Sequence, residues 1–385
     1  MTEFESIRPY SDEEAVEALA RVARHPMTPV ISKYLFPKEK ATFLSRRLSS
    51  TTGVDDFQNK IMSSAVTSVL ARTSGGFTWS GAEHLRKLGD KKFLAISNHR
   101  DIVVDPALTQ YMLFSENIPL TQICVGDNLL KSRLIEDLMR SNRMVKVLRG
   151  LGPRELYKSS KILSSYLRDS ITSGNSSVWI AQREGRTKNG LDASEQGLMK
   201  MFDMSGEKGF EENFAELNIV PMSISYEYES CDARKARELL IKENNGGKYV
   251  KKKNEDTHSI LTGIRQRKGH IHLTIGEPIT REELAQAAST GKSMNDHYQA
   301  LCKILDNRII GGYRLWKTNY MGYDLVHGTS EYLGVKYLPE ELDNFKAYSE
   351  HKLGKLERRL DSDRLHQIFW NIYGGPVESK KSIQE

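Results

Sequence analysis

His99 and Asp105 are the residues of this 385-residue chain whose types and spacing best suit acid–base chemistry. The apolar residues 93–96 predict a short buried strand just before His99. Asp105 precedes Pro106, and an Asp–Pro pair is typical of a helix start with the carboxylate as N-cap. We therefore expect both side chains in a strand-to-helix loop, where α/β sheets bind ligands. A histidine held there by a carboxylate can take a proton from a hydroxyl.

Each of these residues also has a purely structural interpretation. Asp105 could serve only as the helix N-cap, and a single histidine in a loop is more commonly solvated than catalytic. Asp101 offers a second carboxylate on the same loop and could orient His99 in place of Asp105. The case for chemistry therefore depends on polar groups elsewhere in the chain.

Basic side chains follow two further predicted strands, residues 144–148 and 177–181. A guanidinium group can donate two parallel hydrogen bonds to two oxygens of one phosphate. The grouping of these cations therefore predicts a phosphate-bearing substrate. A single arginine at a strand end more commonly forms a surface ion pair, and only the grouping favours a phosphate site. Glu184 lies among the cations, next to Gly185, and is expected to orient them rather than act as the base. The cations are Arg149, Arg183, Arg186 and Lys188.

Alternating strands and helices over residues 86–285 predict an α/β catalytic domain with a mostly parallel central sheet flanked by helices. Further strands are expected at 120–125, 219–226 and 270–275. Residues 1–85 are expected to form an N-terminal helical subdomain, with helices following a capping box at Ser11 and Glu14 and over 38–48 and 54–71. Residues 286–385 are expected to form a helical C-terminal extension.

Three segments have more than one interpretation. Lys248–Lys253 is either a solvated basic loop or a contact for a nucleotide phosphate or an anionic lipid head group. Residues 365–373 are apolar and aromatic, and docking on the core is favoured over membrane contact. The last dozen residues are expected to be disordered.

Composition excludes several classes of protein. The chain has 38% hydrophobic and 28% charged residues, a net charge of +6, and no apolar run near the roughly 20 residues that span a bilayer. The acidic N-terminus does not predict a signal peptide. Three widely separated cysteines predict a reduced cytoplasmic setting and no zinc site. The scattered basic residues argue against nucleic-acid binding.

Four ordered blocks between residues 90 and 280 resemble the glycerol-phosphate and lysophosphatidate acyltransferases of glycerolipid synthesis. Asn98, His99 and Arg100 with Asp105 resemble the catalytic His…Asp block. Residues 145–149 are similar to the block whose arginine binds the acceptor. Residues 179–188 resemble the Glu-Gly block that contacts the acceptor phosphate. Residues 219–222 resemble the apolar-Pro block that lies near the acyl donor. The family usually has four residues between His and Asp, whereas five separate them here.

The resemblance implies an O-acyltransferase of phospholipid biosynthesis, with an acyl group moving from acyl-CoA or acyl-carrier protein to glycerol-3-phosphate or 1-acylglycerol-3-phosphate. His99 and Asp105 would be catalytic. Substrate binding would involve Asn98, Arg100, Arg149, Arg183, Glu184, Gly185, Arg186 and Lys188. No metal or resident cofactor is expected, and the protein would bind the inner face of a membrane peripherally. The alternatives are an acyltransferase for another acceptor, such as a lyso-aminolipid, and a non-catalytic lipid-binding protein.

Overall fold

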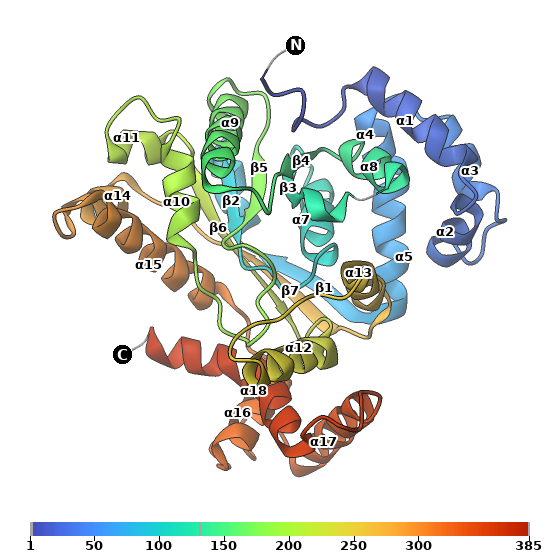
Figure 1. Cartoon of the computed structure of the whole chain (residues 1–385), viewed down its shortest axis with the longest axis vertical. Helices are drawn as coiled ribbons and strands as arrows, with labels where there is room; N and C mark the ends of the chain where they lie inside the picture. Colours follow the sequence, from blue (N-terminus) through green and yellow to red (C-terminus); the bar gives the residue numbers. More distant parts are fainter. Residues whose placement is uncertain (1–2, 131, 384–385) are drawn as a thin grey trace.

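The computed structural model describes residues 3–130 and 132–383 and contains a central seven-stranded sheet with the order β1-β7-β6-β2-β5-β3-β4 (Figure 1). All neighbouring strands are parallel except β6 and β7, which confirms the predicted α/β class. The strands are β1 (Ser74–Ser80), β2 (Leu94–Ser97), β3 (Gln122–Gly126), β4 (Met144–Val147), β5 (Val178–Ala181), β6 (Ile219–Tyr226) and β7 (Gly269–Ile275).

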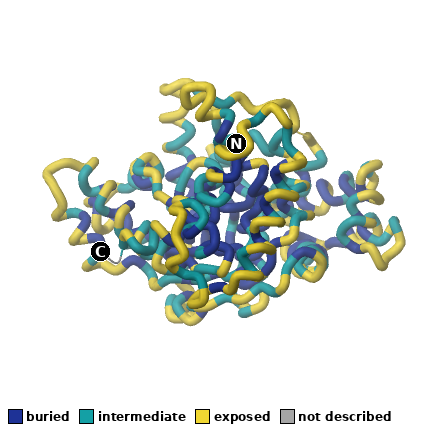
Figure 2. Tube along the Cα trace, turned by 90° about the horizontal axis from the view of Figure 1, so that it is seen from below, coloured by how far each residue is buried: buried dark blue, intermediate teal, exposed yellow. Residues whose placement is uncertain are grey.

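Side chains of the central strands alternate between two hydrophobic clusters, one on each face of the sheet. Leu94 and Ile96 pack with helices α9 (Pro153–Thr172), α10 (Gln196–Asp203) and α15 (Met294–Gly312), whereas Ala95 packs toward α7 (Val104–Ser115). Both faces of the sheet are thus covered, and Figure 2 shows that the buried residues gather in the interior of the molecule. Such double coverage explains why the strands are almost continuously apolar in sequence.

Helices before and after the sheet form two further clusters. The first contains α1 (Asp12–Arg24), α2 (Thr28–Leu35), α3 (Phe43–Ser49), α4 (Val54–Phe57), the π-helical turn η1 (Gln58–Met62) and α5 (Ser63–Thr73). The second joins α12 (Asp232–Asn244) to α16 (Lys317–His327), α17 (Pro339–Leu353) and α18 (Ser362–Ser382). The remaining helices are α6 (Ala82–Lys87), η2 (Asp127–Leu129), α8 (Arg133–Arg140), α11 (Phe210–Ala215), α13 (Glu255–Arg265) and α14 (Arg281–Ser289).

Three local predictions differ from the structure. Residues 74–80, which lie in the expected N-terminal helical subdomain, form β1, because they pair with β7 some 190 residues later in the chain. The helix expected from residue 38 begins at Phe43, whose amide closes a turn on the Lys40 carbonyl. The last dozen residues are not disordered as far as the structure describes them, since α18 continues to Ser382; residues 384–385 lie outside the described part.

Residues 365–373 dock on the core as predicted, and Phe369 is fully buried. The capping box at Ser11 and Glu14 is also confirmed. Within the described ranges, no helix has both the length and the apolar character required to cross a membrane. The division into three domains stays a prediction, although β1 lies inside the segment expected to form the N-terminal helical subdomain.

Candidate active site

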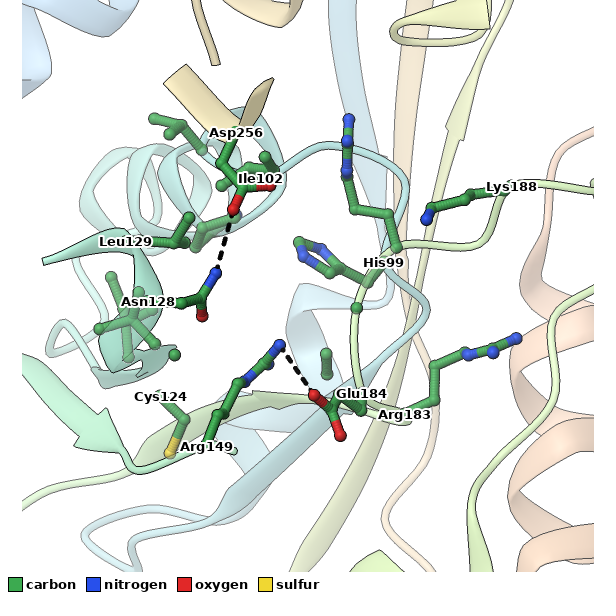
Figure 3. A pocket seen from close by; sticks show the side chains of 18 of the residues that line it. His99, Ile102, Cys124, Asn128, Leu129, Arg149, Arg183, Glu184, Lys188 and Asp256 are labelled. Carbon is green, nitrogen blue, oxygen red and sulfur yellow. Dashed lines mark hydrogen bonds and ion pairs between the residues drawn. The ribbon is translucent and has the colours of Figure 1, made fainter. Parts of the chain in front are cut away.

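The loop between β2 and α7 brings His99 and Asp105 into direct contact. The Nδ1 atom of His99 lies 2.9 Å from Asp105 Oδ2, and the His99 side chain is only 14% exposed. Because the carboxylate accepts the Nδ1 proton, Nε2 carries the lone pair, and the ring projects into a cleft of about 290 Å³ (Figure 3). This is the geometry of a general base with its orienting carboxylate.

The five intervening residues are accommodated because the loop folds back on Asp105. The backbone amides of Arg100 and Asp101 donate to Asp105 Oδ2 at 2.6 and 2.8 Å. The second oxygen, Oδ1, accepts the Tyr226 hydroxyl at 2.6 Å. Burial and the neighbouring Asp105 raise the pKa of Tyr226 well above its ordinary value, so the hydroxyl stays protonated and donates. Asp105 is therefore fixed from both sides.

Asp101 performs the capping role that the sequence assigned to Asp105. Its Oδ1 accepts the amides of Val103 and Val104 at 2.9 and 2.8 Å, at the start of α7. Its Oδ2 accepts the Ser230 hydroxyl and points away from His99. The expected N-cap assignment of Asp105 is thus wrong, and the orienting carboxylate is Asp105 rather than Asp101.

The predicted cations reach the cleft from the ends of β4 and β5, the two strands that flank β3. Arg149 follows β4 and forms an ion pair with Glu184 at 3.3 Å, so Glu184 orients a cation as expected. Arg183 follows β5 and extends away from His99 toward Glu195, 3.9 Å away (Figure 3). Gly185 has a φ of +71°, which a residue with a side chain rarely adopts, and lets the chain turn between them.

Arg186 and Lys188 are the other two predicted cations that line the cleft. Lys188 pairs with Glu238 of α12, and burial lowers the pKa of Lys188 despite that partner. Arg186 has a buried Nη1 atom without a hydrogen-bond partner among the described residues. The cleft is apolar toward β3 and β4, where its wall is Ile123, Val125, Leu129, Met139 and Met144. The cavity lining thus combines cations with apolar residues.

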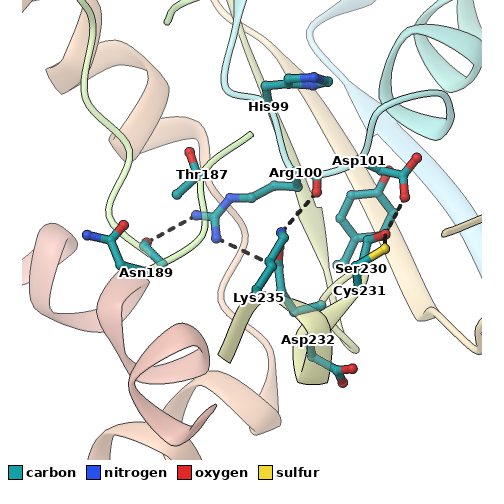
Figure 4. A network of polar contacts seen from close by, with 12 residues as sticks. His99, Arg100, Asp101, Thr187, Asn189, Ser230, Cys231, Asp232 and Lys235 are labelled. Atoms are coloured by element: carbon teal, nitrogen blue, oxygen red, sulfur yellow. Dashed lines mark hydrogen bonds and ion pairs between the residues drawn. The ribbon is translucent and has the colours of Figure 1, made fainter. Parts of the chain in front are cut away.

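Asn98 and Arg100 are not brought to the cleft. Asn98 is fully buried and exchanges hydrogen bonds with the Ile224 backbone of β6. Arg100 is 1% exposed and donates to Asp192 Oδ2 at 2.6 Å and to Glu229 at 3.5 Å. Figure 4 shows Arg100 directed into this network while His99 lies apart from it. Their expected substrate contacts are replaced by contacts that hold the loop.

Several members of this network were not predicted from the sequence. They could have been sought as the hydrogen-bond partners that buried polar and charged groups require. The Asp105 carboxylate has two oxygens, and His99 contacts only one of them. The other oxygen needs a second donor, and the Tyr226 hydroxyl supplies it. Arg100 is balanced by Asp192 and Glu229, and Lys235 donates to Glu229 at 2.5 Å and to the Arg100 carbonyl at 2.9 Å. Buried charges of this kind require partners.

Two other kinds of group bear on the chemistry of the cleft, a thiol nucleophile and a set of metal ligands. Cys124 lines it, but burial raises the pKa of its thiol to about 12, so it stays protonated. In residues 3–130 and 132–383, no group of three or more His, Cys, Asp or Glu side chains is arranged to hold a metal ion. His99 stays the candidate acid–base group of the cleft.

Comparison with known proteins agrees with the four sequence blocks. The family model described as Acyltransferase matches residues 76–225, from β1 to the end of β6. Dihydroxyacetone phosphate acyltransferase from Mus musculus is 24% identical over 204 residues, which cover 52% of this chain and 28% of the relative. The match thus spans little more than a quarter of that relative's length. Residues 76–225, which contain all four sequence blocks, are therefore similar to the family described as Acyltransferase.

Proposed function

We propose that the protein transfers an acyl group from a thioester to a hydroxyl of a phosphorylated glycerol-type acceptor, as a step of phospholipid biosynthesis. The observation that carries the proposal is the Asp105-bound His99 with its second nitrogen turned to a cleft that is lined by both cations and apolar residues. No metal or resident cofactor takes part in the proposed reaction.

In this mechanism, His99 Nε2 takes the proton of the acceptor hydroxyl as its oxygen attacks the thioester carbonyl. The tetrahedral oxyanion then expels the thiolate, which recovers the proton from the imidazolium. Asp105 stabilises the imidazolium and keeps the proton on Nδ1. Arg149, Arg183, Arg186 and Lys188 hold the acceptor phosphate, which places the hydroxyl beside His99. The apolar wall by Met139 and Met144 takes the acyl chain.

The acceptor is the part of the proposal that an assay decides most directly. Purified protein is offered one acyl-CoA with glycerol-3-phosphate, 1-acylglycerol-3-phosphate or dihydroxyacetone phosphate, the last because it appears in the relative's name. We expect turnover with at least one of them. Arg149→Ala should raise the KM for that acceptor about tenfold, because one charge-assisted contact is lost. Turnover with a lyso-aminolipid alone, or none with any acceptor, would contradict the proposal.

We also propose a cytoplasmic protein that binds the inner face of a membrane peripherally. Supporting this, Val250 is 87% exposed beside exposed Lys248 on the loop between α12 and α13. Anionic lipid should strengthen binding by on the order of 1 kcal/mol for each lysine near the surface, and salt should weaken it. Co-sedimentation with neutral and anionic vesicles measures this, and equal binding to both would exclude the basic loop as the contact.

A further inference from the structure

The first ten residues of α9 extend beyond the core on which the rest of the helix packs. Residues 153–158 are exposed, residues 159–162 are exposed or half-buried, and the first buried residue of the helix is Leu163, its eleventh. At a rise of about 1.5 Å per residue, this overhang is roughly 15 Å long. In every other helix of ten residues or more that the structure describes, a buried residue comes within the first seven positions. Among these helices, α9 therefore has the start that the protein itself covers least.

An apolar stripe continues along the overhang. Leu156 precedes Leu163 by seven residues and Leu167 by eleven, which are spacings of one face of a helix. Leu163 and Leu167 are buried, whereas Leu156 is 49% exposed and the neighbouring Tyr157 is 63% exposed. Because most of the stability of a helix in a protein comes from packing such a face, a partly uncovered one indicates a partner. The overhang thus presents a core-type face beyond the end of the core.

Basic side chains occupy the other side of the overhang. Arg154 and Lys158 are each two residues from Leu156, which places them opposite it on a helix of about 3.6 residues per turn. Lys161 follows Lys158 by three residues, and all three cations are exposed. None of them forms an ion pair with a carboxylate in the part of the chain that the structure describes. Three cations against one carboxylate, Glu155, leave the overhang with a net charge of +2.

The overhang begins close to the catalytic cleft. Arg149 lines the cleft and is four residues before Pro153, the first residue of α9. Four residues of extended chain span at most about 14 Å, so the Cα atom of Pro153 is no farther than that from the Cα atom of Arg149. Lys251, on the basic loop between α12 and α13, lines the same cleft. The overhang and the basic loop are thus both neighbours of the cleft.

A lipid bilayer is the partner that fits this combination of side chains. Helices that lie in the plane of a membrane surface carry leucines and aromatic rings on one face and lysines and arginines on the other. Tyrosine is enriched at the depth of the lipid head groups, because its ring is apolar and its hydroxyl is polar. The unpaired cations complement the negative surface of anionic lipids. An acidic protein would complement the cations as well, but it would not supply the acyl chains of the proposed reaction.

We propose that residues 153–162 of α9 form a membrane-docking surface, which inserts Leu156 and Tyr157 among the lipid head groups and holds the cleft next to the bilayer. The inference rests on the proposed function for the lipid nature of the substrates and adds a second contact to the basic loop. A single weak anchor binds membranes only reversibly, whereas two contacts on the same surface reinforce each other. An acyl chain then passes between the bilayer and the cleft over a short distance.

The test is the double variant Leu156→Ser/Tyr157→Ser, measured by co-sedimentation with vesicles of equal parts phosphatidylcholine and phosphatidylglycerol. Its matched control is Met27→Ser/Val30→Ser, because these residues are 47% and 58% exposed at the start of α2, which Figure 1 shows well separated from α9. We expect the partition coefficient to fall about tenfold or more in the α9 variant, because two apolar side chains no longer leave water, and to stay within about twofold in the control. Thermal unfolding should be the same in all three proteins, since the substituted side chains lie outside the core.

A second variant reads the contact as a gain of signal. Tyr157→Trp keeps an aromatic ring on the overhang, and Val30→Trp places the same reporter on α2. We expect lipids that are brominated in their acyl chains to quench the fluorescence of Tyr157→Trp more than that of the wild type, which has four tryptophans. Quenching of Val30→Trp should equal that of the wild type. Equal quenching in all three proteins would contradict insertion of the overhang.

Vesicle binding is measured without turnover, so the inference and the proposed acyl transfer fail separately. Loss of binding in the α9 variant alone would support the inference even if no acceptor were acylated. Equal binding by the wild type, the variant and the control would overturn it and leave the basic loop as the membrane contact. An equal loss in the variant and the control would also overturn it. So would a wild type that binds acyl-carrier protein through Leu156 and Tyr157 and binds no vesicle.

Discussion

The two sides of the loop that follows β2 use the same residue types for different purposes. His99 lies on the cleft side, and the cations that share its cavity are partly exposed, with Arg149 at 32% and Arg183 at 33%. On the interior side, Arg100 and its carboxylate partners are at most 5% exposed. A half-exposed arginine can exchange its partner for a substrate, whereas a buried one cannot without leaving a charge uncompensated.

The buried side is internally neutral. Arg100 and Lys235 face Asp192 and Glu229, so two positive charges balance two negative ones. Burial alone would lower the pKa of Arg100, but the two carboxylates outweigh it and raise that pKa above its ordinary value. The network stays charged and holds the loop that carries His99 and Asp105. The two sides should therefore respond differently to substitution.

The largest effect on stability is expected from Arg100→Ala. The change leaves Asp192 and Glu229 buried with one cation, and should lower the free energy of unfolding by about 3–5 kcal/mol in denaturant titrations. Arg364→Ala, which breaks the exposed pair with Glu243, is the control and should cost less than about 1 kcal/mol. If Arg100→Ala does not yield folded protein, Arg100→Lys is used instead. It keeps the charge, and its loss of unfolding free energy should lie between the losses expected for Arg100→Ala and Arg364→Ala. Equal losses in Arg100→Ala and Arg364→Ala would remove the distinction between the two sides.

On the cleft side, His99→Ala should leave unfolding nearly unchanged and lower kcat on the order of a hundredfold or more, the scale of a general base. The control is His270→Ala, because His270 also contacts a carboxylate, Glu227, at 2.9 Å but lies on β7 outside the cleft. Turnover and thermal unfolding are measured on both variants. Near-normal turnover in His99→Ala would make His99 a structural histidine.

Tyr226 connects the two sides, so Tyr226→Phe should affect both by smaller amounts. Removing the hydroxyl leaves Asp105 Oδ1 without this donor and should cost about 1–3 kcal/mol of stability, with kcat about tenfold lower as the pair loosens. Tyr298→Phe is a matched control, since its hydroxyl donates to Asp203 at 2.6 Å away from the cleft. The control should lose stability without losing kcat. A parallel loss of kcat in both would mean that Tyr226 acts through stability alone.

Most of the sheet could be predicted from the sequence because its strands are short apolar runs whose pattern is local. The strands expected near residues 94, 122, 144, 178, 219 and 270 are all present. β1 was missed because Ser74 and two glycines have little strand preference of their own, and pairing with β7 makes them a strand. The end of the C-terminal helix, which was expected to be disordered, was missed for the same reason, since the stability of α18 comes from packing on α12 and α16.

By itself, the sequence determined the order of the blocks, the proximity of His99 to Asp105 and the approach of arginines from two strand ends. Each of these follows from local pattern and from the way parallel strands end at one edge. Only the tertiary structure decided that Arg100 faces inward, because its partners Asp192 and Glu229 are about a hundred residues distant in the chain. His99 and Arg100 are adjacent on one loop and face opposite sides of it. Which of these sides is a cleft and which is interior depends on the distant segments that pack against the loop.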